Sequence, residues 1–220
     1  MSIYENQSRD PSHSGTKGLA SFRFGRWARD LKSSLDYPFW TLRGRTAPDN
    51  HVYKKARIRK LAAATQCRSF VETGTFYGQM VNFATNVFDR IISIEIYPPF
   101  HSKNAAIFRD DPKVTILLGD SAQNLGQALS LAAGPTLFWL DGHYSGNGTG
   151  LGDKVSPIIE ELQIIARSDQ REHCIVIDDR RLFIGAGGYP TIEETVDELK
   201  RINPNYQISF DCDSIVARTV

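Results

Sequence analysis

The fold of this chain is indicated most clearly by the stretch Val71-Glu72-Thr73-Gly74-Thr75-Phe76-Tyr77-Gly78. A short apolar run from Arg68 to Val71 predicts a buried strand, and the residues from Gln79 to Phe88 predict a helix. A glycine turn between a strand and a helix lets the backbone approach a ligand, and the helix N-terminus offers unpaired N–H groups. Such turns also occur for purely structural reasons.

The acid in this turn narrows the choice of ligand. Glu72 disfavours a phosphate and favours a cationic or hydroxyl-bearing ligand. S-adenosylmethionine carries an ammonium and a sulfonium, so it suits the turn better than a dinucleotide pyrophosphate does. We expect the cofactor to be bound here by Glu72, Thr73, Gly74, Thr75, Tyr77 and Gly78.

Apolar runs alternate with helical patterns along the rest of the chain. The runs are Phe70–Val71, Ile91–Ile94, Val114–Leu118, Thr136–Leu140 and Cys174–Ile177. The helices are expected at Gln79–Phe88, Pro99–Arg109, Ala122–Ala132, Ser156–Arg167 and Thr191–Ile202, the last with Thr191 as N-cap. Nearly continuous Val/Ile/Leu strands separated by helices predict a parallel sheet covered on both faces.

The end of the chain departs from this alternation. Tyr206–Phe210 and Ser214–Ala217 flank Asp211-Cys212-Asp213, which predicts a tight β-hairpin. The predicted fold is therefore α/β: a doubly wound, mostly parallel seven-stranded sheet that finishes in an antiparallel hairpin.

Every parallel strand is followed by an acid. The acids are Glu72, Glu95, Asp120, Asp141 and the pair Asp178-Asp179. Ligands of open α/β sheets bind beyond the carboxyl ends of the strands, so these side chains are expected at one edge. Because crowded carboxylates repel each other, the edge is expected to hold a cationic or hydroxyl-rich ligand.

The second and third acids suit a nucleoside. Glu95 lies 23 residues after Glu72, about the spacing at which an acid ending the second strand reaches a ribose diol. Asp120 with Ser121 is expected to accept the exocyclic amine of adenine, with Ile96 forming part of the apolar wall. The alternative for Asp120 is that it is only a helix N-cap.

The remaining acids suggest a metal and a catalytic group. Asp141, Asp178 and Asp179 form a hard oxygen set suited to Mg²⁺, which would lower the pKa of a substrate hydroxyl. The alternative is that Asp178 caps a turn and Asp179 pairs with an adjacent arginine. His143, two residues after Asp141, is the candidate general base, and Asp141 is expected to take part in catalysis and to contact the cofactor.

Size and composition suit one globular domain with an extension. The chain has 220 residues, of which 41% are hydrophobic and 23% charged. It has no apolar run long enough for a bilayer and no signal peptide, and its three cysteines lack CxxC spacing, so a cytoplasmic location is expected.

Charge is distributed unevenly. Residues 17–60 contain twelve Lys or Arg against three Asp, whereas the whole chain has a net charge of +1. A basic arm of this kind can bind anionic lipid or nucleic acid, but we favour a solvated face that pairs with the body. We divide the chain into a loose or disordered tail (1–18), a basic helical extension packed on the core (19–66) and the main domain (67–220). Seven large apolar residues of the extension are expected to pack on the domain: Phe22, Phe24, Trp27, Leu31, Leu35, Phe39 and Trp40.

From Arg68 to Val220 the chain resembles class I S-adenosylmethionine-dependent methyltransferases, and more narrowly the metal-dependent O-methyltransferases of the catechol and macrocin types. The most specific parts are Glu72-Thr73-Gly74 through Gly78, Glu95, Leu140-Asp141-Gly142 and Ile177-Asp178-Asp179. The resemblance implies that Glu72 and the turn hold the methionine moiety, Glu95 the ribose, and the last three acids Mg²⁺. Several members have a Lys or His base three residues after the first metal acid, where this chain has Tyr144.

The expected function is O-methylation of a small-molecule hydroxyl, on a sugar or secondary metabolite, with S-adenosylmethionine as cofactor and Mg²⁺ as helper. No nucleic-acid partner is expected, and a homodimer is left open. The alternatives are an NAD-dependent oxidoreductase, and a non-catalytic Rossmann-like protein whose basic arm binds nucleic acid or membrane.

Overall fold

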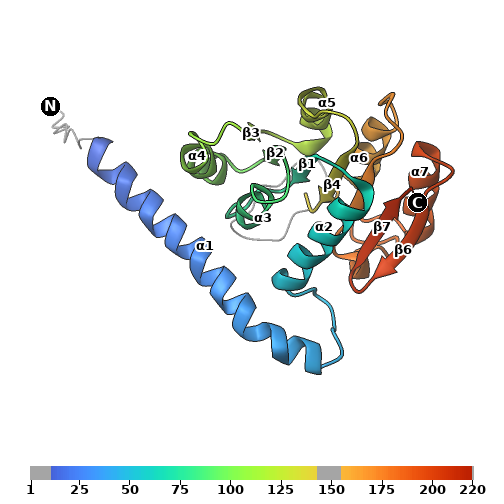
Figure 1. The fold of residues 1–220 in the computed structure, drawn as a ribbon, viewed down its shortest axis with the longest axis horizontal. Helices are drawn as coiled ribbons and strands as arrows, with labels where there is room; N and C mark the ends of the chain where they lie inside the picture. The colour runs from blue at the N-terminus through green and yellow to red at the C-terminus, as the bar shows by residue number, and fades with distance from the viewer. Residues whose placement is uncertain (1–10, 143–154, 220) are drawn as a thin grey trace, which may run out of the picture.

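A computed structural model describes residues 11–142 and 155–219 of the chain. Its centre is a seven-stranded sheet in the order β3-β2-β1-β4-β5-β7-β6 (Figure 1). The strands are β1 (Ser69–Thr73), β2 (Arg90–Glu95), β3 (Val114–Leu118), β4 (Thr136–Leu140), β5 (Cys174–Ile177), β6 (Gln207–Asp211) and β7 (Ser214–Arg218). The first five pair in parallel, whereas β7 runs antiparallel to both β5 and β6. The predicted sheet and its terminal hairpin are confirmed.

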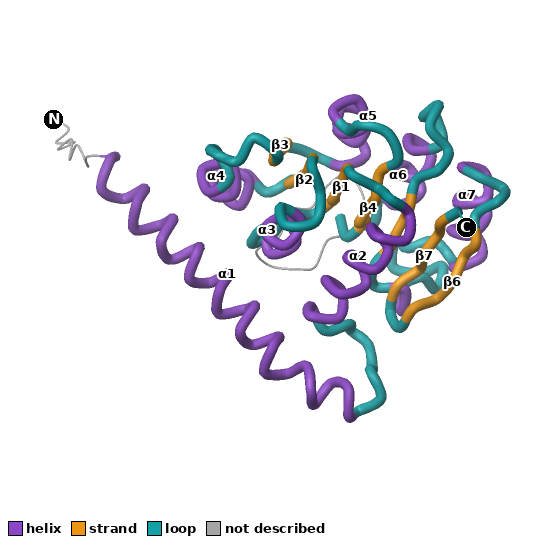
Figure 2. The backbone as a smooth tube through the Cα atoms, viewed as in Figure 1, coloured by secondary structure: helices purple, strands orange, loops and turns teal. Residues whose placement is uncertain are grey.

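Helices cover both faces of this sheet (Figure 2). They are α1 (Pro11–Leu42), α2 (His51–Thr65), α3 (Gln79–Ala84), α4 (Pro98–Ile107), α5 (Ser121–Leu131), α6 (Ile158–Ile165), α7 (Ile192–Ile202) and the short 3-10 helix η1 (Arg180–Leu182). One core cluster joins the sheet to α5, α6 and α7, and the other joins it to α2, α3 and the end of α4. The central parallel strands β1, β2, β4 and β5 are buried on both sides, which explains why they appear in the sequence as continuous apolar runs. The edge strands β3 and β6 are partly exposed.

The predicted helices form with shifted ends. Thr191 caps α7 in a capping box with Glu194, as its position before an apolar-periodic segment predicts. The helix expected over residues 79–88 stops at Ala84, and the chain then turns to bury Phe88 under the sheet. The helix expected from Ser156 begins at Ile158, after Pro157.

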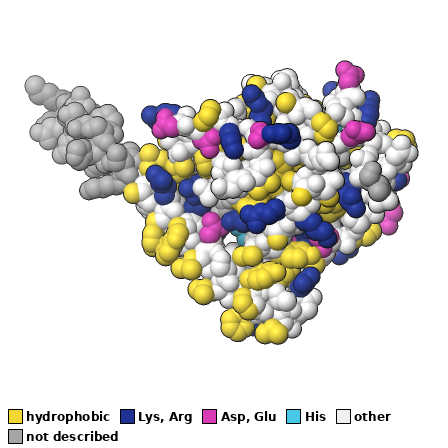
Figure 3. Space-filling model, viewed as in Figure 1, with side chains coloured by type: hydrophobic (Ala, Val, Ile, Leu, Met, Phe, Trp, Pro, Cys, Tyr) yellow, Lys and Arg dark blue, Asp and Glu magenta, His cyan; other side chains and the backbone are white. Residues whose placement is uncertain are grey.

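Helix α1 departs most from expectation. It begins at Pro11, so the tail predicted for residues 1–18 overlaps a helix; residues 1–10 lie outside the described residues. Only Phe22 of its large apolar side chains is buried, where it stacks on Tyr77 with 4.7 Å between ring centroids. The side chains that face solvent instead are Phe24, Trp27, Leu31, Leu35, Phe39 and Leu42, with exposed fractions of 43–83%. They form much of the yellow surface along α1 (Figure 3).

The prediction that the extension packs its large apolar side chains on the domain is confirmed for Phe22 and wrong for the five that are exposed: Phe24, Trp27, Leu31, Leu35 and Phe39. Trp40 is half-buried, with 5.2 Å between its ring centroid and that of Tyr53. The helix geometry explains the exposed side chains. A long straight helix can meet the body only along one stripe, and α1 uses that stripe for contacts with α2 and α4. Most of its other large apolar side chains are therefore exposed to solvent.

Helix α2 is attached to the body by its cations. Arg57 is buried and donates hydrogen bonds to Asp49, to the Asp211 carboxylate (2.8 Å) and to Ser214 Oγ (2.6 Å). Tyr53 Oη donates to the second Asp211 oxygen at 2.7 Å. Part of the positive charge of the extension is therefore used in pairs with the body. None of the helices within the described ranges is long and apolar enough to cross a membrane.

Candidate functional site

The strand ends meet at one edge because the parallel strands are in register. Thr73 pairs with Leu140, and Leu140 pairs with Ile177. The next residues along β4 and β5 are Asp141 and Asp178, which therefore leave the sheet side by side. The acids are gathered at this edge, as the sequence predicts.

Glu72 lies inside β1, one residue before its end, and is buried. Its Oε2 accepts a hydrogen bond from Ser93 Oγ at 2.6 Å. Burial raises the pKa of Glu72 well above its ordinary value, and the nearby charges of Asp141 and Glu95 raise it further. Three of the predicted acids therefore interact electrostatically.

The glycine turn is pressed against the end of β4. Gly74 has φ +92°, and a Cβ placed on it would lie 2.8 Å from the backbone oxygen of Asp141. Gly78 has φ +70° and forms the N-cap of α3. Thr73 Oγ1 accepts hydrogen bonds from the N–H groups of Asp141 (3.2 Å) and Gly142 (3.1 Å). The structure confirms the turn; its contact with a cofactor stays a prediction.

Glu95 ties the glycine turn to β2. It is the last residue of that strand, and its two carboxylate oxygens accept from the backbone N–H groups of Phe76 (2.7 Å) and Tyr97 (2.8 Å). Burial raises the pKa of Glu95, and these two hydrogen bonds oppose the rise. Each carboxylate oxygen has a second lone pair with which it can accept a ligand hydroxyl.

The adenine-binding candidates occupy different environments. Asp120 is the N-cap of α5, and its Oδ1 accepts from Ala122 N at 2.8 Å, as the alternative interpretation expected. Ser121 is buried, whereas Ile96 and Tyr77 are half-buried at the same edge. Thr75 Oγ1 hydrogen-bonds Ser93 Oγ at 2.6 Å inside the turn. Adenine recognition by these residues stays a prediction.

Lys54 of α2 reaches the acids that follow β4 and β5. Its Nζ donates to Asp178 Oδ2, and the Asp178 side chain is fully buried. Burial lowers the pKa of Lys54, but the carboxylates of Asp178, Asp141 and Asp179 raise it by more. Burial and the charge of Asp141 raise the pKa of Asp178 to about 7, an effect that Lys54 opposes. The pKa of Asp178 stays below that of Lys54, so the proton of the pair remains on Lys54 as an ammonium.

The predicted Mg²⁺ site does not fit this arrangement. Asp178 is paired with Lys54, and Asp179 accepts a hydrogen bond from Arg181 Nη1 at 2.7 Å. Across residues 11–142 and 155–219, no three His, Cys, Asp or Glu side chains are arranged to hold a metal ion. The sequence groups Asp141, Asp178 and Asp179 because all three follow strands, but strand position does not reveal which basic side chains pack against them.

Glu161 is a buried acid that the sequence interpretation missed. It lies on α6, and its Oε1 accepts no hydrogen bond from the described part of the chain. Burial raises its pKa to about 7, an effect that the hydroxyls of Ser121 and Thr73 partly oppose. Its position among Ile158, Leu162 and Ile165, which form the buried stripe of α6, was the available signal.

Glu161 lines a small hollow beside the site. Asp178 also lines this hollow. The remaining wall of the hollow includes apolar and glycine residues of β4, β5, α6 and the adjoining loops: Leu140, Gly142, Ile158, Ile177, Phe183 and Tyr189. The hollow therefore joins the edge of the sheet to the side of α6.

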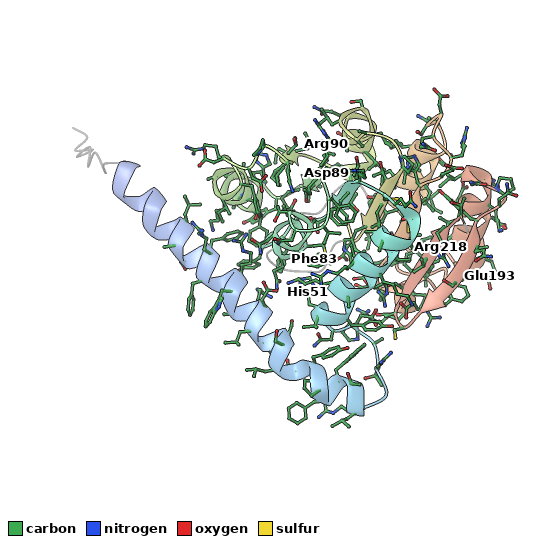
Figure 4. All side chains as sticks on the ribbon, in the orientation of Figure 1. His51, Phe83, Asp89, Arg90, Glu193 and Arg218 are labelled. Atoms are coloured by element: carbon green, nitrogen blue, oxygen red, sulfur yellow. The ribbon has the colours of Figure 1, made fainter. Side chains whose placement is uncertain are left out.

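His51, the first residue of α2, is a second residue near the site that the sequence does not identify (Figure 4). Burial lowers its pKa to about 3, and the charges of Lys55 and Lys54 lower it further. Its ring is therefore neutral at physiological pH. The candidate base His143 and its neighbour Tyr144 lie outside the described residues.

Solved structures share this architecture. An O-methyltransferase from Bacillus cereus in complex with SAH matches with a TM-score of 0.56 and 13% identity, over 97% of this chain and 93% of that chain. An O-methyltransferase from Streptomyces achromogenes, involved in tomaymycin synthesis and in complex with SAM, matches with a TM-score of 0.52 and 14% identity, over 99% and 92%. No protein-family model and no curated protein sequence matches this chain. At this level of identity the likeness establishes the architecture: the chain has the fold of the class I methyltransferases.

Proposed function

We propose that this chain is an S-adenosylmethionine-dependent O-methyltransferase that acts on a hydroxyl of a small molecule such as a sugar or secondary metabolite. The fold it shares with O-methyltransferases solved in complex with SAH and SAM supports this proposal.

The observation that carries the proposal is the set of acids beside the glycine turn. Burial raises the pKa of Glu72, and the charges of Asp141 and Glu95 raise it further. Glu95 accepts a hydrogen bond from Phe76 N in the turn, and the backbone oxygen of Asp141 lies against Gly74. A ligand with an ammonium and a sulfonium would offset this crowding of negative charge. In the proposed complex Glu72 and the turn face the methionine moiety, and Glu95 accepts the ribose hydroxyls.

The proposed reaction is an in-line displacement. The bond between the sulfonium sulfur and the methyl carbon breaks as the bond from the acceptor oxygen to that carbon forms, and the hydroxyl proton leaves to a base. Such a transfer depends mainly on positioning. His143 and Asp141 stay the proposed catalytic residues, and a homodimer stays open. Mg²⁺ is left out of the proposed reaction because cations of the chain already engage Asp178 and Asp179.

Calorimetric titration with S-adenosylhomocysteine tests the proposal. We expect the wild-type protein to bind it, and Glu95→Gln to weaken binding at least tenfold, about 1.4 kcal/mol. The matched control is Asp89→Asn (Figure 4), which removes an exposed acid paired with Arg68 at the opposite end of β2. Equal affinities for wild type and Glu95→Gln would remove the ribose assignment.

The alternative functions predict different results in two further assays. Thermal stabilisation by NAD⁺ with no response to S-adenosylhomocysteine would select an oxidoreductase. Steeply salt-dependent RNA binding, with no methyl transfer to small acceptors, would select a non-catalytic binding protein.

A further inference from the structure

We propose that the ammonium of Lys54, and not a divalent cation, is the resident counter-charge of Asp178, the buried acid that follows β5. Lys54 belongs to a helix that precedes the sheet in sequence, 124 residues before its partner Asp178.

The packing of α2 directs Lys54 to this place. Ile58 and Ala62 are buried against the sheet and belong to its core. Residues four apart lie on the same side of a helix, so Lys54 continues this buried stripe by one turn. Asn50 caps the helix, with its Oδ1 accepting from Val52 N at 2.8 Å, and so fixes where the first turn begins.

The ammonium of Lys54 is largely buried and has an aromatic ring and a carboxylate beside it. The Lys54 side chain is only 15% exposed, and its Nζ lies 5.6 Å from the centre of the Trp139 ring. Asp178 uses both carboxylate oxygens, because Oδ2 accepts from Lys54 and Oδ1 accepts from Ser214 Oγ at 3.2 Å. An aromatic face and a buried carboxylate both favour an ammonium at this position.

The same arrangement disfavours a divalent ion. Mg²⁺ and Mn²⁺ require several oxygen atoms that can turn their lone pairs to the metal. Asp178 has both oxygens hydrogen-bonded, and Asp179 is bonded to Arg181, which also binds Asp213. A divalent ion would have to displace Lys54 or lie beside its positive charge.

The first experiment titrates the full-length protein with Mn²⁺ at pH 7.5 and follows free Mn²⁺ by electron paramagnetic resonance. We expect no saturable binding up to a concentration on the order of 1 mM, the weak end of the range for dedicated divalent-ion sites. One equivalent of Mn²⁺ bound to the wild type, and lost in Asp178→Asn, would overturn the proposal.

The second experiment is a double-mutant cycle in thermal unfolding. Lys54→Met keeps the stem of the side chain but removes the charge, so Asp178 is left buried without its partner. We expect the melting temperature to fall by about 5–10 °C, and most of this loss to be recovered when Asp178→Asn is added.

Lys55→Met is the matched control. Lys55 is adjacent to Lys54 on α2 but pairs with Asp30 of α1 at 2.6 Å. Its effect should be independent of Asp178→Asn. If Lys54→Met and Lys55→Met respond equally to Asp178→Asn, the specific pairing is refuted. Neither experiment requires cofactor binding or methyl transfer, so failure of the proposed function would be seen separately.

Discussion

Neutralising the buried acid of α6 should stabilise the protein in a pH-dependent way. Glu161 is almost fully buried, and its pKa is raised from 4.5 to about 7 in the folded state. Below pH 4.5 the carboxyl is protonated in both folded and unfolded protein, so it adds no cost. Between pH 4.5 and pH 7 the folded state binds more protons than the unfolded state does, so stability falls as the pH rises and the loss is complete above about pH 7.

The size of the effect follows from the pKa difference. The two pKa values differ by about 2.5, and each pKa unit corresponds to about 1.36 kcal/mol. Ionisation of buried Glu161 therefore lowers the free energy of unfolding by at most about 3 kcal/mol above pH 7. Glu161→Gln is neutral at every pH and removes this loss. We therefore expect the variant to be more stable than wild type at pH 8, by up to about 3 kcal/mol, and the advantage to shrink towards pH 5.

Urea unfolding followed by circular dichroism at pH 5, 6, 7 and 8 measures the difference directly. Glu160→Gln is the control, because Glu160 is the preceding residue on α6 but is half-buried. Its effect on the free energy of unfolding should vary less with pH. If the difference between Glu161→Gln and wild type stays constant from pH 5 to pH 8, the reasoning from burial is refuted.

Two further substitutions test the backbone and the attachment of α2. Gly74→Ala places a Cβ 2.8 Å from the Asp141 backbone oxygen at φ +92°, so urea unfolding should show a loss of about 1–3 kcal/mol, and calorimetry should show weaker S-adenosylhomocysteine binding. Arg57→Met leaves buried Asp49 without its cation and should cost about 3–5 kcal/mol in the same unfolding assay. Exposed Arg59→Met should cost far less; equal losses for the two arginine variants would contradict the role given to burial.

Much of the architecture could be predicted from local sequence. The strands appear as continuous runs of Val, Ile and Leu because both faces of the sheet are covered, and Thr191 before α7 is recognisable as a cap. The hairpin after α7 is also recognisable, since two short strand patterns flank Asp211-Cys212-Asp213. The predicted ends of helices were less accurate: α3 stops at Ala84, four residues before the predicted end at Phe88.

For the long N-terminal helix, composition predicts the burial of side chains incorrectly. Many large apolar residues predict a buried segment, yet Trp27 and Phe39 of α1 are exposed because the body contacts another side of the helix. Burial depends on which face meets a partner, and composition alone does not specify that face.

By itself the sequence determined the order of strands and helices, the glycine turn at Gly74, and the acids that follow each parallel strand. Backbone preference and apolar spacing are properties of neighbouring residues, so these features can be recognised along the chain. Only the tertiary structure decided which charges meet. Lys54 reaches Asp178 across 124 residues, and Glu161 is turned into the interior, because helix packing brings together side chains that chain order does not.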